Sequence, residues 1–314
     1  MSYFNLSRIT GNHKYVSKAE SLLKSLLNVS QKENFSGHCW GYDHPWQSKG
    51  FFAERYSPNI VVTVFVALAF QMAYKYTQKN EYLEIAKNVS NFIQKDLTTI
   101  IDSENYLCSS YIPDNNWKVI NINALIADYY SVLHNSTKEK SYMLTASKYI
   151  NWVVSTQTDY GAWFYAEPPK SDSITHDNYH TGFVLDSIFD YMENTGDRTY
   201  EEAYLKGLDY YRGNLFTDQY APKWMYNKTY PHDIHGVAQG IITFTKANKY
   251  NSRYLKVAEN IANWGIQYLY NGDGRFLYQK GKYWTKSFTL MRWCQGWMCY
   301  ALSNYLIAAN VNRD

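Results

Sequence analysis

Apolar and polar residues follow a helical period over most of the chain, in two alternating kinds of segment. Segments of the first kind are apolar along one face and begin with a Tyr, followed four residues later by a small residue in four of five cases. The tyrosines stand about 60 residues apart, at Tyr15, Tyr82, Tyr142, Tyr200 and Tyr254. A repeat of this length indicates one helical unit used several times, each copy packing against its neighbours.

Segments of the second kind are apolar on nearly every face, which is typical of buried helices. They lie between the amphipathic segments, at 58–76, 123–134, 180–194, 235–248 and 289–308. A short alternating stretch precedes several of them, at 162–165, 223–226 and 275–278, and predicts one arm of a small hairpin. The predicted order is therefore outer helix, hairpin-containing loop, inner helix.

This order predicts an all-α fold, an (α/α) toroid of helical hairpins with short β-hairpins at one mouth, in a single domain over 1–314. Five pairs fit the repeat if the helix near Tyr15 packs on the inner helix near Arg292 and closes the ring. A six-pair ring with one poorly marked unit stays open. Because all inner helices then run the same way, their N-termini meet at one mouth, where free N–H groups and helix dipoles favour anionic groups.

Composition narrows the choice of partners. The 31 basic and 28 acidic residues are evenly spread and give a net charge of +3, which predicts no nucleic-acid or membrane surface. The 32 Tyr and 10 Trp supply rings that suit core packing and also stacking on sugars. Residues 1–10 lack a signal-peptide pattern, the apolar stretch 60–70 is short for a membrane span, and the four Cys show no disulfide spacing. We expect a reduced, cytoplasmic protein that is not integral to a membrane.

Three polar residues occupy nearly the same place in successive repeats, close to the starts of inner helices. Asn123, His180 and His235 each precede the Tyr of the next outer helix by about 19 residues. Core packing would place apolar or small residues there, so we expect these side chains to face the mouth. Asp177 and Asp233, just before the two histidines, fit catalysis and helix capping about equally well.

The loops that lead into the inner helices hold most of the remaining candidates. Arg292 stands on an otherwise apolar helix, where it needs either an acid such as Glu54 or an anionic substrate. The candidate catalytic residues are His180, His235, Tyr179, Asp177, Asp233 and Arg292. The candidate substrate-binding residues are Trp40, Trp46, Glu54, Arg55, Tyr56, Asn59, Asn123, Trp293 and Gln295.

A metal site has little support from the sequence. Cys39, His235 and Cys294 could be combined as a Cys/Cys/His zinc set, but their spacing does not match a recognised zinc pattern. We therefore expect no metal and no other cofactor.

Four stretches carry a resemblance to a known family. They are Trp40-Gly41-Tyr42 with Trp46-Gln47, the run Asp-Asn-Tyr-His-Thr-Gly-Phe-Val-Leu at 177–185, Asp233-Ile234-His235 with Ala238-Gln239, and Arg292-Trp293 with Gln295 and Trp297-Met298. From about residue 40 to residue 305 the chain resembles a poorly characterised family of (α/α)-toroid proteins encoded in exopolysaccharide, capsule and O-antigen gene clusters. More distantly it is similar to toroid glycoside hydrolases, uronate lyases and glucuronyl epimerases. The resemblance implies polysaccharide metabolism or biosynthesis, a glycan ligand and association with polysaccharide-assembly enzymes, although a fold does not fix a reaction.

Three functions fit these residues. In a lyase or epimerase acting on a uronate, Arg292 would neutralise the carboxylate, a histidine would take the C5 proton and a tyrosine would act as acid. In a glycoside hydrolase, Asp177 and Asp233, or Glu54, would flank the glycosidic bond. In a non-catalytic component of polysaccharide assembly, the aromatic mouth would only bind a glycan. The sequence leaves open the sugar, the linkage, the reaction and the oligomeric state.

Overall fold

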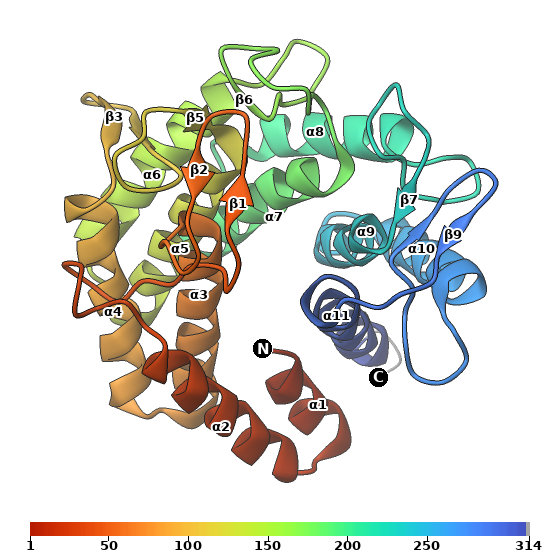
Figure 1. Ribbon diagram of the computed structural model, residues 1–314, viewed down its shortest axis with the longest axis horizontal. Helices are drawn as coiled ribbons and strands as arrows, with labels where there is room; N and C mark the ends of the chain where they lie inside the picture. The colour runs from red at the N-terminus through yellow and green to blue at the C-terminus, as the bar shows by residue number, and fades with distance from the viewer. Residues whose placement is uncertain (312–314) are drawn as a thin grey trace.

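The computed structural model describes residues 1–311, and a ring of helices accounts for most of them (Figure 1). Within the described residues, six helices line the inside of the ring: α1 (Ser2–Thr10), α3 (Ile60–Thr77), α5 (Ile120–Thr137), α7 (Asn178–Thr195), α9 (Ile234–Ala247) and α11 (Trp297–Val311). Five lie outside them: α2 (Lys14–Asn28), α4 (Asn80–Lys95), α6 (Lys140–Ser155), α8 (Glu201–Asn214) and α10 (Arg253–Leu269). The predicted (α/α) toroid is confirmed.

The ring closes differently from the prediction. Each outer helix packs against the inner helix that precedes it, so α2 pairs with α1 and not with α11. The helix α1 packs in turn against α11, where Asn5 Nδ2 donates to Ser303 Oγ at 3.0 Å. The predicted packing of the Tyr15 helix on the last inner helix is therefore wrong. With nine residues, α1 is too short to stand out in the periodicity.

Burial explains the recurring small residue on the outer helices. Ala86, Ala146 and Ala258, each four residues after the repeat Tyr, are fully buried on the faces that meet the inner helices. The approach is close enough for the Tyr129 hydroxyl of α5 to donate to the Ala86 carbonyl of α4 at 2.7 Å. A larger side chain at these positions would push the two layers apart, because protein interiors are close-packed.

The helix α3 extends the apolar stretch 60–70 to eighteen residues, Ile60–Thr77. Among the described residues it is the one helix long and apolar enough to cross a bilayer by length and composition, and 44% of it is buried inside the protein. It lines the ring beside α5, and it packs against α4 on its outer side. Its apolar surface is thus used for packing.

Short strands connect the loops before the inner helices. β1 (Trp46–Gln47) pairs with β2 (Phe52–Ala53), and β3 (Thr99–Asp102) pairs with β4 (Leu107–Ser109). β5 (Lys118–Val119) pairs with β6 (Ala166–Glu167), and β8 (Gln279–Lys280) lies between β7 (His232–Asp233) and β9 (Thr285–Lys286). The segments predicted as hairpin arms form only isolated bridges at Met225 and Phe276. Two of the pairings, β5 with β6 and β7 with β8, join different loops, so these loops brace one another at the mouth.

One glycine marks a close approach of two inner helices. A Cβ added to Gly182 of α7 would lie 2.3 Å from Cγ of Gln239 on α9, which is inside van der Waals contact. Gln239 is fully buried, and its Nε2 donates to Asp186 of α7 at 2.9 Å. Glycine is therefore needed at this position for packing between the helices.

Candidate active site

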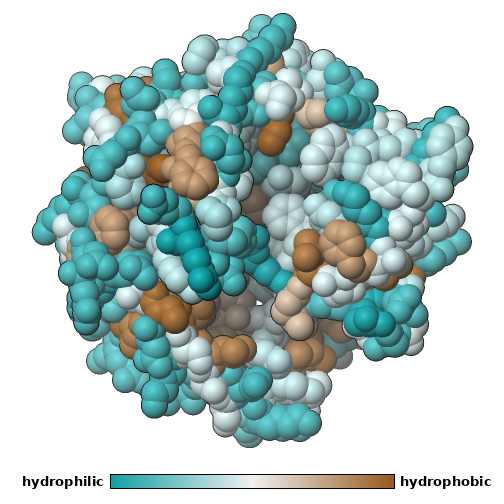
Figure 2. All heavy atoms as spheres, in the orientation of Figure 1, coloured by the Kyte–Doolittle hydropathy of each residue, from teal (hydrophilic) through white to brown (hydrophobic). Residues whose placement is uncertain are grey.

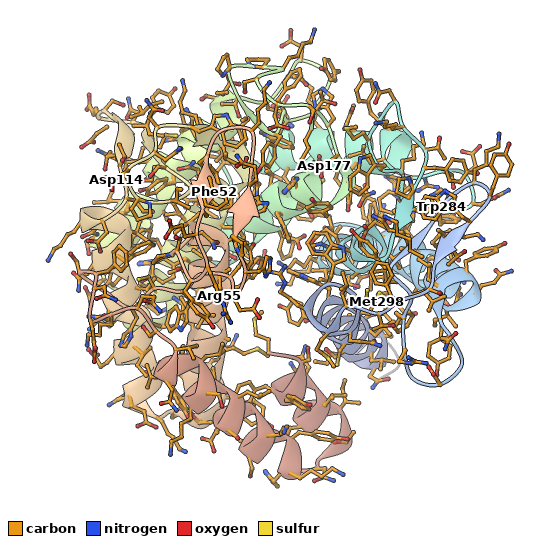
Figure 3. All side chains as sticks on the ribbon, in the orientation of Figure 1. Phe52, Arg55, Asp114, Asp177, Trp284 and Met298 are labelled. Atoms are coloured by element: carbon orange, nitrogen blue, oxygen red, sulfur yellow. The ribbon has the colours of Figure 1, made fainter. Side chains whose placement is uncertain are left out.

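The starts of α7, α9 and α11 bring the two candidate histidines together at the mouth. Figure 2 shows the face that carries the hairpins, which is hollowed near its centre. Asp177 is the residue that precedes α7 (Figure 3), and His235 is the second residue of α9. Before α11 the chain forms a π-helical turn, Met291–Gly296, which carries Arg292 and Trp293. Such turns are rare and occur often at functional sites.

An aspartate orients the first histidine. His180 Nδ1 donates to Asp177 Oδ2 at 2.8 Å, and the histidine side chain is 16% exposed. With the proton on Nδ1, Nε2 carries the lone pair, and among the described residues it has no hydrogen-bond partner. This arrangement is that of a general base: a carboxylate fixes the tautomer, and the other nitrogen is left to accept a proton.

A tyrosine lies between the two histidines. The ring of Tyr179 is centred 4.2 Å from that of His180 and 4.7 Å from that of His235, nearly parallel to the latter. Burial raises the pKa of Tyr179 well above its ordinary value, and the nearby carboxylates of Asp177 and Asp233 raise it further. The hydroxyl therefore keeps its proton at neutral pH and can serve as an acid or a hydrogen-bond donor.

The second histidine is buried without a polar partner. His235 is 2% exposed, and neither ring nitrogen has a hydrogen bond within the described part of the chain. Its ring stacks on Trp297 at 4.6 Å and meets the edge of Trp293 at 4.4 Å. Burial lowers its pKa well below the ordinary value, and repulsion from Arg292, and from His180 whenever that ring is protonated, acts in the same direction. His235 is thus neutral, with one donor and one acceptor left for a ligand.

The Asp233 carboxylate links several segments of the site through hydrogen bonds. Its Oδ1 accepts from the His235 backbone N–H at 2.8 Å, which caps α9, and from Trp293 Nε1 at 2.8 Å. Its Oδ2 accepts from Gln279 Nε2 of β8 at 2.7 Å. Burial is the main cause of its raised pKa. Asp233 therefore positions two site residues, and all of its bonds are to protein groups.

Arg292 lies exposed at the rim. Its guanidinium stands 4.5 Å from the ring centre of Tyr42, and no acidic group of the described residues forms an ion pair with it. Glu54, the structural partner considered from the sequence, is exposed and is not in contact with it. The arginine is free to meet an anionic group that enters the mouth.

Three predicted substrate-binding residues lie in the core. Trp40 is 2% exposed and donates from Nε1 to the Leu26 carbonyl at 2.7 Å, so it cannot stack on a sugar. Asn123 is fully buried, and its amide bonds only to Ser109 and Val119 backbone groups. Asn59 caps α3 by accepting from Val62 N at 3.0 Å, which leaves its buried Nδ2 unpartnered. Trp40 and Asn123 are thus buried and hydrogen-bonded to backbone groups of the protein.

The remaining candidates surround the opening. Arg55 and Tyr56 follow β2 and are exposed, with the guanidinium 4.6 Å from the tyrosine ring, and Figure 3 places Arg55 at the edge of the central opening. Trp46 is half-buried and packs edge-on against Phe51 at 5.1 Å. Gln295 is half-buried in the π turn. Trp293, by contrast, contacts the His235 ring directly, at 4.4 Å.

The sequence reasoning missed two residues next to His180. Tyr165 lies with its ring centre 4.6 Å from that of the histidine, and Asn121 lines a small pocket with it. The Oδ1 atom of Asn121 is buried and unpartnered. The helix α5 begins at Ile120, three residues earlier than predicted, so Asn121, and not Asn123, corresponds to His235 as second residue of its helix. The repeat contained this signal, but the predicted helix start hid it.

The zinc combination finds no geometric support. No three His, Cys, Asp or Glu side chains among residues 1–311 lie close enough to hold a metal ion. Cys39 is fully buried, and burial raises the pKa of its thiol to about 12.

Similar folds occur among solved structures of carbohydrate enzymes. A sugar epimerase from a ruminal bacterium matches with a TM-score of 0.76 at 13% identity, over 94% of this chain and 82% of its own. A cellobiose 2-epimerase from Bacillus thermoamylovorans matches with a TM-score of 0.77 at 12% identity, over 98% and 85%. An unsaturated glucuronyl hydrolase specific for heparin matches with a TM-score of 0.71 at 11% identity, over 100% and 85%. No protein-family model and no curated protein matches the sequence. At these identities the likeness shows the fold, and the chain is an (α/α) toroid.

Proposed function

We propose that the chain is a carbohydrate-active enzyme that removes a proton from a carbon of a sugar acid, in a uronate-containing glycan. The observation that carries the proposal is the group of His180 held by Asp177, Tyr179 between two histidines, and the unpaired Arg292. The toroid neighbours that act on sugars, two of them named as epimerases, support the substrate class.

In the proposed reaction, Arg292 neutralises the uronate carboxylate and so acidifies the adjacent C5 proton. His180 Nε2 takes that proton, while Asp177 keeps the imidazole in the required tautomer and stabilises the imidazolium that forms. Tyr179 donates its proton either to the leaving oxygen at C4 or to the opposite face of C5. The first outcome is β-elimination by a lyase, and the second is epimerisation.

Glycoside hydrolysis is the second candidate, and two of its three candidate carboxyl groups are already engaged. It requires two carboxyl groups on either side of the bond. Asp233 accepts three hydrogen bonds from protein donors, and Asp177 is bonded to His180. Because one similar structure is a glucuronyl hydrolase, the test also measures hydrolysis.

The test is a time course with uronate-containing oligosaccharides in D2O. Loss of the H5 signal by proton NMR reports C5 deprotonation, ultraviolet absorbance reports a C4–C5 double bond, and an end-group assay reports hydrolysis. We expect His180→Ala to abolish H5 exchange and His13→Ala, an exposed histidine between α1 and α2, to leave it unchanged. Full turnover in both His180→Ala and His235→Ala would overturn the assignment. New ends without H5 loss or double bonds would favour the hydrolase, and binding without any reaction would favour the assembly component.

A further inference from the structure

A second cavity lies on the opposite side of the ring from the mouth. It has a volume of about 480 Å³ and is lined by all six inner helices, mainly by their second halves. On the side towards the mouth, the cavity is bounded by a layer of three rings, Phe65, Phe183 and Trp297, whose centres are 5.1 to 5.5 Å apart. We call these residues the aromatic layer. Phe183 and Trp297 of this layer also contact the ring of His235, so the layer separates the cavity from the candidate active site.

Unused hydrogen-bond acceptors gather in the wall of this cavity. Gln71 Oε1, Asp128 Oδ1, Asp186 Oδ1 and Gln239 Oε1 are buried and have no partner among the described residues. The side chains of Gln71, Asp128 and Gln239 are at least nine-tenths buried. Because an unmatched buried polar atom destabilises a protein, several in one place indicate a ligand that donates hydrogen bonds.

The charges on the wall formed by α5, α7 and α9 favour a cationic ligand. Asp128, Asp186 and Asp190 face the cavity from α5 and α7, and the half-buried Lys246 of α9 beside them is bonded to Asp190 and lies 3.8 Å from Asp186. Asp128 has no ion-pair partner within residues 1–311. Burial raises its pKa well above the ordinary value, and Asp190 and Asp186 add repulsion.

Positive groups lie on the other side of the cavity. Arg8 and Lys75 line this edge of the space and are exposed on α1 and α3. The cavity therefore has an acidic, acceptor-rich wall formed by α5, α7 and α9 and a basic edge formed by α1 and α3. A ligand cation would be drawn to the first and away from the second.

We propose that this cavity is a second binding site, for a small amino polyol whose ammonium group meets Asp128 and Asp186 and whose hydroxyl groups donate to Gln71 and Gln239. The volume falls within the usual range of small-molecule pockets. A neutral sugar would add no positive charge to a wall in which Lys246 faces three aspartates, and a simple diamine would leave the two glutamine acceptors unmatched. The site does not depend on the reaction at the mouth.

Isothermal titration calorimetry with glucosamine as the probe tests the proposal, with glucose and putrescine as partial ligands. We expect glucosamine to bind at least about tenfold more tightly than either partial ligand, a difference of about 1.4 kcal/mol. Asp128→Asn should weaken glucosamine binding by at least tenfold, and Gln71→Met should do so independently. The exposed residue Asp209 on α8 supplies the control Asp209→Asn, which should bind as the parent does.

A second readout separates a lost ligand contact from a lost fold. Asp128→Asn keeps the shape of the side chain and replaces a carboxyl group whose burial disfavours its ionised form, so the Tm of the free protein should stay equal or rise while the probe no longer increases it. His180→Ala should bind glucosamine unchanged. Absence of glucosamine binding, unchanged binding in Asp128→Asn and Gln71→Met, or loss of binding in His180→Ala would each overturn the proposal. The proton-exchange activity can fail without affecting any of these results.

Discussion

Replacing Asp233 by Ala tests whether this carboxylate mainly supports the architecture of the mouth. The side chain accepts three hydrogen bonds, from the His235 backbone N–H, Trp293 Nε1 and Gln279 Nε2. It joins α9, the π turn and β8, three segments that are distant in the sequence. Because alanine offers no acceptor, all three donors lose their partner at once.

The magnitude follows from the burial of those donors. Losing the cap of α9 costs about 1 kcal/mol. Gln279 is 4% exposed, so its stranded Nε2 costs about 1–3 kcal/mol more, and the half-buried indole N–H of Trp293 adds a smaller amount. The raised pKa of Asp233 shows that burying the carboxylate has its own cost, which alanine removes. We expect a net loss of about 3 kcal/mol, a large part of the stability of a typical protein.

Urea denaturation followed by circular dichroism measures this loss, with Asp209→Ala on the exposed face of α8 as the control. The control should differ from the parent by less than about 0.5 kcal/mol. Tryptophan fluorescence should also change in Asp233→Ala, because the indole of Trp293 loses its anchor. A loss under about 1 kcal/mol relative to the control would refute the reasoning. It would mean that the three hydrogen bonds add no net stability, and Asp233 would again be a candidate catalytic residue.

Three further changes have expected outcomes. Asp177→Asn should lower kcat/KM by about 10²–10⁴-fold with little change in stability, since it disturbs the tautomer of the neighbouring histidine; equal activity in steady-state assays would contradict this. Gly182→Ala should destabilise the folded protein by about 1–3 kcal/mol, because the added Cβ clashes with Gln239. Gly213→Ala, near the end of α8 and with open space around it, should stabilise the protein by up to about 1 kcal/mol. Equal shifts in Tm for the two variants would contradict this. Burial raises the pKa of Asp186 to about 6, above an unfolded value of about 3.9, so the folded state holds this proton more tightly. Stability should therefore fall by about 3 kcal/mol as the pH rises from about 4 to about 6, and urea titrations of Asp186→Asn should lack that part of the fall.

The periodicity was enough to predict the toroid, because a buried helix and an amphipathic helix place apolar residues in different patterns. It failed at the start of the chain, where α1 is one short helix without a preceding repeat unit. The sequence also could not show that strands pair between loops, such as β5 with β6, since their partners lie about 50 residues apart.

The candidate site was predicted where its residues fall within the first turn of an inner helix. His180, Tyr179 and His235 meet as expected from their equivalent positions. Trp40 and Asn123 show the limit of this reasoning, because residue type and loop location do not reveal burial. The second cavity was not visible in the sequence at all: Asp128 and Asp186 look like ordinary polar positions of helices until the ring brings them together.

The contact between α1 and α11 has a consequence for how this chain folds. The other helices that pack extensively on one another are at most two helices apart in the sequence, so these units can form by local, rapid steps. The Asn5–Ser303 hydrogen bond instead joins residues 298 positions apart. Bringing the two ends together carries the largest loop-closure entropy in the molecule, although this cost grows only slowly with length. We therefore expect the helical hairpins to form an open arc first. The second cavity, which all six inner helices line, would exist only after the two ends meet.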